Sequence, residues 1–170
     1  LDLPAFASFP LLGSDDGRRR LADYYRDHWQ IADAHEVGVV FETPTWRASP
    51  DWGTHLGYDL GQLATFNRDA ASLLLDLRDA VGADAERFVV SGNLGPRGDG
   101  YQPGARMTAE EATRYHSWQV GVFAESGVDL VTILTANYVE EGLGVANAAA
   151  AAGLPTVVSL TDLNDSEMMH

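Results

Sequence analysis

Polar side chains that could bind a ligand or transfer a proton follow the strand-like segments of this sequence. They are Glu42, Thr43 and Thr45 after the first apolar run, Asn93 after the second and Thr135 after the third. A Glu at the end of a buried strand can act as a general base or bind an ammonium group. A structural ion pair with an Arg is the alternative for Glu42. We predict that these five residues line a substrate site, and we assign a catalytic role to none of them.

A glycine-rich, charged loop follows the second apolar run, from Ser91 to Gly100. Loops at the carboxyl ends of parallel strands commonly bind ligands. Pro96 lacks the backbone N–H that a phosphate would need, and the glycines do not have the spacing of a dinucleotide site. Arg97 and Asp99 are expected to pair within the loop, and contacts with a ligand are the alternative. The sequence therefore predicts a ligand-binding loop and not a phosphate loop.

The residue types exclude several kinds of catalytic site. The chain has no Cys and no Lys, so it cannot supply a thiolate zinc site, a thiol nucleophile, a Schiff-base lysine or a Walker lysine. Its five histidines do not have the spacing of zinc ligands. We therefore predict no metal ligands within these residues.

The charge balance also limits the partners. Asp and Glu total 25 against 11 basic residues, which gives a net charge of −14. Nucleic acid and anionic membrane surfaces are not expected as partners, because binding to phosphates needs clustered basic residues. No apolar run approaches the roughly 18 residues of a membrane-spanning helix. The absence of cysteine suits the cytoplasm, and we expect a cytoplasmic protein.

Helix-like and strand-like segments alternate along the chain, which predicts an α/β fold with a parallel sheet in a single domain, residues 1–170. Asp59 is the expected N-cap of one helix, Thr108 opens a capping box and Gly127 ends a helix. These units fit either an open doubly wound sheet or part of a (β/α)₈ barrel, which needs about 250 residues when complete. The expected helices are 15–34, 59–80, 108–126 and 139–152, and the expected strands are 37–41, 88–90, 129–134 and 156–160.

These expected helices and strands also predict which side chains are buried. Leu21, Tyr25, His28 and Ala32 share one face of the first helix, and the strand 37–41 reads as buried on both sides. The tryptophans at 46 and 52 flank an Arg and could either wall an apolar pocket or pack within a surface loop. The acidic segment 162–167 is expected to be an exposed tail or a junction where intervening residues are missing.

Several of these segments resemble the homocysteine S-methyltransferase family, which includes enzymes that use betaine or S-methylmethionine. The loop 91–99 resembles the family's Gly-x-x-Gly-Pro loop, and 43–49 resembles its Thr-Asn-Thr-Tyr-x-Ala-Ser segment. The resemblance runs in order from Leu3 to Thr161. It continues through Asn67-Arg68, 123–131, Glu140-Glu141, Gly153-Leu154-Pro155 and 158–161.

The resemblance implies a (β/α)₈ barrel that transfers a methyl group from a sulfonium or ammonium donor to a thiol such as homocysteine. By this resemblance the chain holds strands two to five, the N-terminal half of the barrel, with the first strand before Leu1. It also implies a zinc ion held by three cysteines after Thr161, so the 170 residues alone are expected to be inactive. The expected partners are an amino-acid thiol and a methyl donor, and a homo-oligomer is left open.

One position departs from the family pattern. Leu134 stands where members commonly have a Glu that holds the ammonium group of the amino acid. Glu42 could take over that role from a neighbouring strand, or the substrate could differ from homocysteine. Two other hypotheses remain, namely a catalytically silent barrel that binds a ligand and a metal-free barrel enzyme that uses Glu42 as a base.

Overall fold

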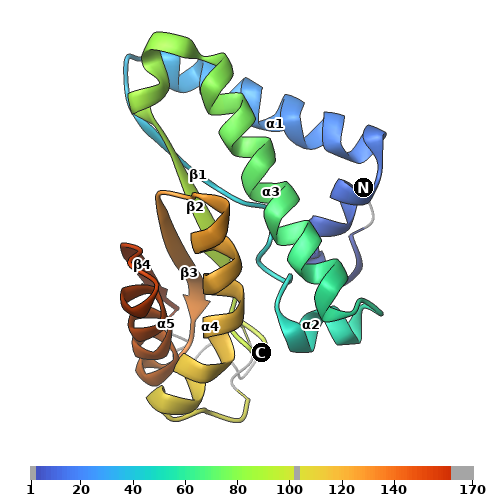
Figure 1. Ribbon diagram of the computed structural model, residues 1–170, viewed down its shortest axis with the longest axis vertical. Coiled ribbons are helices and arrows are strands. Elements are labelled where there is room, and N and C mark those ends of the chain that lie inside the picture. The colour runs from blue at the N-terminus through green and yellow to red at the C-terminus, as the bar shows by residue number, and fades with distance from the viewer. Residues whose placement is uncertain (1–2, 102–103, 162–170) are drawn as a thin grey trace, which may run out of the picture.

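The computed structural model describes residues 3–101 and 104–161. Its centre is a parallel sheet of four strands, which follow one another in chain order from one edge to the other (Figure 1). The predicted α/β fold with a parallel sheet is therefore confirmed. The strands are β1 (Val39–Glu42), β2 (Phe88–Leu94), β3 (Leu130–Ala136) and β4 (Thr156–Leu160).

Four long helices lie side by side along the sheet, and each contacts the next in the order α1, α3, α4, α5 (Figure 1). They are α1 (Asp15–Ala34), α3 (Leu60–Ala80), α4 (Ala109–Ser126) and α5 (Val139–Ala151). The short helix α2 (Pro50–His55) lies in the loop after β1, and three short 3₁₀ segments, η1 (Pro4–Phe6), η2 (Phe9–Gly13) and η3 (Gly82–Arg87), complete the described chain.

The ends of the helices follow the local sequence signals. Asp59 and Gln62 form a capping box at the start of α3, and Thr108 and Glu111 form another at the start of α4. Each box satisfies backbone N–H groups that the first helical turn leaves without an intrahelical partner. Gly127 ends α4 in the left-handed conformation, with a φ of 78°. These three predictions are confirmed.

The two faces of the sheet differ because side chains alternate along a strand. Phe41, Val90 and Ile133 belong to one buried cluster with Leu74 of α3 and Phe123 of α4. Gly92 of β2 also faces α4, since a Cβ there would lie 2.6 Å from ring atoms of Phe123. The helices therefore cover one face, and the polar residues described below lie on the other.

Two local predictions about the first strand and helix are wrong. The strand begins at Val39, and Val40 is 52% exposed, because β1 is an edge of the described sheet. His28 is exposed, although Leu21, Tyr25 and Ala32 on the same helix are buried as expected. The segment 162–167 lies outside the described residues. No helix within residues 3–101 and 104–161 is long and apolar enough to cross a membrane.

Candidate functional site

Glu42 lies at the carboxyl end of β1, beside hydroxyl groups from the next two strands. It is opposite Ser91 of β2, whose hydroxyl lies 2.8 Å from that of Thr132 on β3. Burial raises the pKa of the Glu42 carboxyl, and hydrogen bonds from Ser91 and Thr132 offset part of the rise. No arginine contributes to this shift, so within the described chain the alternative of a structural ion pair is not supported. Among the described residues, Oε2 of Glu42 is buried without a hydrogen-bond partner.

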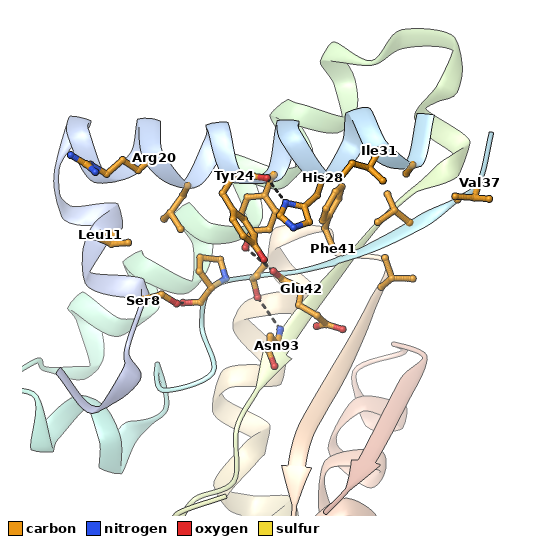
Figure 2. Close-up of a pocket in the computed structure, with 18 of the residues that line it drawn as sticks. Ser8, Leu11, Arg20, Tyr24, His28, Ile31, Val37, Phe41, Glu42 and Asn93 are labelled. Carbon is orange, nitrogen blue, oxygen red and sulfur yellow. Dashed lines mark hydrogen bonds between the residues drawn. The ribbon is translucent and has the colours of Figure 1, made fainter. Parts of the chain in front are cut away.

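Glu42 and Asn93 border a groove of about 790 Å³ between α1 and the edge strand β1. Figure 2 shows Tyr24, His28 and Ile31 of α1 above the groove, with Glu42 and Asn93 below them. Oδ1 of Asn93 is also buried without a partner in the part of the chain that the structure describes. Both of these groove-lining residues thus carry a buried acceptor oxygen that needs a donor, and a carboxylate favours a cationic one.

Thr43 and Thr45 attach the loop after β1 to β2 through three hydrogen bonds. The Asn93 N–H donates to Oγ1 of Thr43 across 2.8 Å, and Oγ1 of Thr45 donates to the Asn93 carbonyl, also across 2.8 Å. The two threonine oxygens are 2.7 Å apart. Since the Thr45 proton is already used, Thr43 donates to Thr45. Both side chains are at most 1% exposed, so these hydroxyls position Asn93.

Thr135 lies at the end of β3, in a different set of contacts. The pairing of β3 with β4 is irregular between Ile133 and Ala136, and Thr135 has a φ of 58°, which is rare for a β-branched residue. Its hydroxyl donates to the Leu134 carbonyl across 2.6 Å and accepts from Nε1 of Trp46 across 3.3 Å. The structure thus brings Glu42, Thr43, Thr45 and Asn93 together and places Thr135 beside Trp46.

The two tryptophans enclose the arginine that lies between them in sequence. The Arg47 guanidinium lies 3.8 Å from the ring centroid of Trp46 and 3.6 Å from that of Trp52. Arg47 is 3% exposed and pairs with Asp99 across 3.5 Å. Burial lowers its pKa, and Asp99 opposes that change. The tryptophans therefore build a stacked cation site around the protein's own arginine.

The ion pairs of the loop after β2 differ from the prediction. Arg97 pairs with Asp51 of α2 across 2.7 Å, while Asp99 pairs with Arg47. The reason is that the Gly98 carbonyl between them accepts hydrogen bonds from Arg47 and Trp52. This arrangement holds the loop against the segment after β1. The expected pair within the loop is replaced by two pairs that join the loop to that segment.

Sequence reasoning missed a buried pair between α4 and α5. Nε2 of His116 lies 3.0 Å from Oε1 of Glu141, and the Arg97 N–H donates to the same oxygen. Glu141 was singled out only as part of the family resemblance. A possible sequence signal is its place near the start of a helix whose N-cap position, Tyr138, has no short polar side chain.

The described residues do not fit the zinc ion that the resemblance implies. They contain no group of three or more His, Cys, Asp or Glu side chains that could hold a metal. The sequence also has no cysteine. The polar side chains that the described residues place at the ends of β1 and β2 are Glu42, its hydroxyl neighbours and Asn93.

The sequence model described as homocysteine S-methyltransferase matches residues 17–170 of the chain. No curated protein matches the chain. The match covers both the strand ends that carry the polar cluster and the loop between β2 and α4.

Solved structures of the homocysteine methyltransferase MmuM from Escherichia coli share the fold. The metallated and oxidized forms each align with a TM-score of 0.72 and 22% identity, over 94% of this chain and 56% of that chain. The apo form aligns with a TM-score of 0.52 and 24% identity, over 65% of this chain and 42% of that chain. The chain thus spans little more than half the length of these relatives, and the predicted fold, part of a (β/α)₈ barrel, is confirmed.

Proposed function

Since this chain belongs to the homocysteine S-methyltransferase family, we propose that the intact protein transfers a methyl group from a sulfonium or ammonium donor to a thiol such as homocysteine. In this reaction the acceptor sulfur forms a bond to the methyl carbon while the bond from that carbon to the donor sulfur or nitrogen breaks. The thiol loses its proton to solvent. The donor leaves as a neutral sulfide or amine.

Within the described residues, the main support for this proposal is the cluster of polar groups around Glu42. Oε2 of Glu42 and Oδ1 of Asn93 are acceptors without a partner among the described residues, and both residues border the groove. An α-ammonium group supplies the N–H donors and the positive charge that a buried carboxylate requires. Glu42 then performs the role that Leu134 cannot, because an apolar side chain does not bind an ammonium group.

The other candidate residues have supporting roles in this proposal. Thr43 and Thr45 hold the Asn93 backbone through their hydroxyl groups, which fixes the direction of the Asn93 side chain. Thr135 lies at the rim, where it accepts from Trp46. Because these residues do not fit a thiolate zinc site, the 170 residues alone are expected not to activate a thiol.

The proposal is tested on the intact protein with homocysteine as acceptor and S-methylmethionine or betaine as donor. We expect methyl transfer, and we expect Glu42→Gln to lower kcat/KM for homocysteine at least tenfold, with a much smaller effect on a thiol that lacks the amino group. Glu86→Gln is the matched control, because Glu86 is exposed and lies before the amino end of β2, whereas Glu42 lies at the carboxyl end of β1. If the intact protein transfers no methyl group from either donor, the proposal is wrong.

A second candidate function follows from the raised pKa of Glu42, which also suits a general base. In that case Glu42 abstracts a proton in a reaction without a metal ion. The two functions differ in the response to Glu42→Gln. Loss of activity toward every substrate favours the base, whereas loss only for substrates with an amino group favours ammonium binding.

A further inference from the structure

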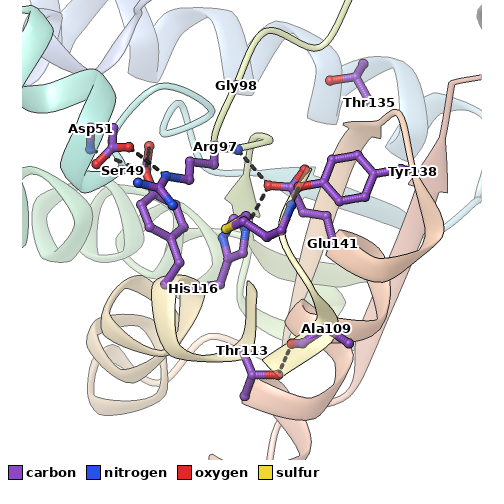
Figure 3. A network of polar contacts seen from close by, with 12 residues as sticks. Ser49, Asp51, Arg97, Gly98, Ala109, Thr113, His116, Thr135, Tyr138 and Glu141 are labelled. Atoms are coloured by element: carbon purple, nitrogen blue, oxygen red, sulfur yellow. Dashed lines mark hydrogen bonds and ion pairs between the residues drawn. The ribbon is translucent and has the colours of Figure 1, made fainter. Parts of the chain in front are cut away.

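A buried carboxylate outside the groove holds the backbone of the loop after β2. Oε1 of Glu141 accepts the Arg97 N–H across 2.7 Å and lies 3.0 Å from Nε2 of His116 (Figure 3). Glu141 and His116 are each 1% exposed. A carboxylate oxygen only accepts, so His116 donates through Nε2–H. Nδ1 of His116 is buried without a hydrogen-bond partner in the described chain.

Glu141 occupies a helix position from which a side chain commonly hydrogen-bonds to the N-cap residue of the same helix. It is the third residue of α5, the place that Gln62 and Glu111 hold in α3 and α4, where each bonds back to its own N-cap. In α5 no N-cap side chain forms a capping bond within the described residues. The Glu141 carboxylate interacts with the side chain of Tyr138 at the N-cap and also joins α5 to another loop, while the positive end of the helix dipole stabilises its charge.

The packing of α4 against α5 brings this carboxylate to its partners. A Cβ at Gly144 would lie 2.3 Å from the Cβ of Ala112, so the glycine permits a close approach of the two helices. His116 lies one turn after Ala112, and Glu141 lies one turn before Gly144. The buried pair therefore lies about one helical turn from a close contact between α4 and α5.

Side chains also hold the loop backbone after Arg97, where the Gly98 carbonyl accepts from Arg47 and Trp52 and the Asp99 carbonyl accepts from Asn137. Pro96 has no N–H, so Arg97 supplies the first backbone donor after Gly95. On its other side the Arg97 side chain pairs with Asp51 and lies over the ring of Tyr115, with 4.9 Å to the centroid. Glu141 thus fixes the backbone at Arg97, and α2 and α4 fix the side chain.

We propose that Glu141, oriented by His116, is a positioning residue that holds the segment from Leu94 to Gly98 in its ligand-binding conformation. This segment begins directly after Asn93, whose side chain borders the groove. A shift at Arg97 moves the backbone that follows Asn93, on the side of the site next to a ligand that Glu42 binds. The effect on catalysis rests on the proposed function, whereas the anchoring of Arg97 does not.

Hydrogen exchange at the Arg97 amide in the intact protein tests the anchoring directly. We expect Glu141→Ala to speed exchange there by at least about tenfold, because the amide loses its charged acceptor. Glu141→Gln keeps an acceptor oxygen and is expected to restore much of the protection. Glu140→Ala is the matched control, because Glu140 is the preceding residue of the same helix and is exposed.

Methyl transfer by the same variants tests the effect on the site. We expect Glu141→Ala to raise KM for the amino-acid thiol more than it lowers kcat, and Glu141→Gln to recover most of the loss. The proposal is overturned if Glu141→Ala leaves exchange at Arg97 unchanged, or raises it equally throughout α4 and α5. If the intact wild-type protein transfers no methyl group, the proposed function fails and the exchange data still decide the anchoring.

Discussion

The hydroxyl of Thr45 donates a hydrogen bond to the carbonyl oxygen of Asn93 across 2.8 Å. Together with the Asn93 N–H on Thr43 and the contact between the two threonines, it closes a ring of three hydrogen bonds. The ring ties the loop after β1 to the end of β2, next to Glu42. The position of Asn93 in the groove is therefore set by side chains that are themselves shielded from solvent.

Thr45→Val tests this ring, because Val has a similar shape without the hydroxyl. We expect the free energy of unfolding to fall by about 1–3 kcal/mol, since the Thr43 hydroxyl and the Asn93 carbonyl both lose a partner in a buried place. Urea unfolding measures the change. Thr65→Val is the control, because the Thr65 hydroxyl bonds the Gly61 carbonyl on an exposed helix face. Equal losses in the two variants would contradict the prediction.

Gly92→Ala tests the contact of β2 with α4. The added Cβ would lie 2.6 Å from ring atoms of Phe123, and we expect a loss of about 1–3 kcal/mol in the free energy of unfolding. Gly121→Ala is expected to raise the free energy of unfolding. A Cβ at Gly121 meets nothing within 4 Å among the described atoms, and Ala is favoured over Gly in a helix by about 1 kcal/mol. Denaturant unfolding of both variants provides the comparison.

Arg47→Lys tests whether the stacking of the Arg47 guanidinium on Trp46 and Trp52 stabilises the protein. An ammonium group does not reproduce the planar contact of a guanidinium with two indole rings, and we expect a loss of about 1–2 kcal/mol in stability. The tryptophan emission is expected to shift to longer wavelength as Trp46 and Trp52 gain access to water. Arg114→Lys is the control, because its pair with Glu110 is on the surface and such pairs contribute about 0–1 kcal/mol. The same emission shift in both variants would argue against the stack.

The raised pKa of Glu42 predicts a dependence of stability on pH. Between its ordinary value of 4.5 and the higher folded value, the native protein holds more protons on this group than the unfolded chain does. The contribution of Glu42 is therefore most favourable below pH 4.5 and becomes less favourable as the pH rises through the folded pKa. We expect Glu42→Gln to remove this decline, so that the urea midpoints of the two proteins separate as the pH increases. A difference between the two urea midpoints that stays constant over the whole pH range would refute this prediction.

Ligand binding is expected to show the opposite trend with pH. The Glu42 carboxylate binds an ammonium group only when it is ionised, so affinity for the amino-acid thiol should rise as the pH passes its raised pKa. Calorimetric titration of the intact protein at several pH values measures this change. Glu42→Gln should bind weakly with little pH dependence in this range, whereas Glu86→Gln should match the wild type.

Much of the fold could be predicted because its signals are local. The capping boxes at Asp59 and Thr108 and the glycine at 127 each act within one turn of the chain. Because all the interacting groups are close in sequence, the sequence is enough to predict these helix ends. Strand positions were less well predicted. Whether Val40 is buried depends on which segment lies beside β1, and periodicity within one strand does not carry that information.

The amino-acid sequence by itself determined the alternation of helices and strands, the family, and the cluster of polar residues at the ends of β1 and β2. Only the tertiary structure decided that Arg47 lies between two tryptophans and pairs with Asp99, and that Glu141 holds the Arg97 backbone. The partners in these contacts are 52 and 44 positions apart in the chain. Such contacts form when helices pack on the sheet and loops meet at its carboxyl edge, so no local pattern specifies them.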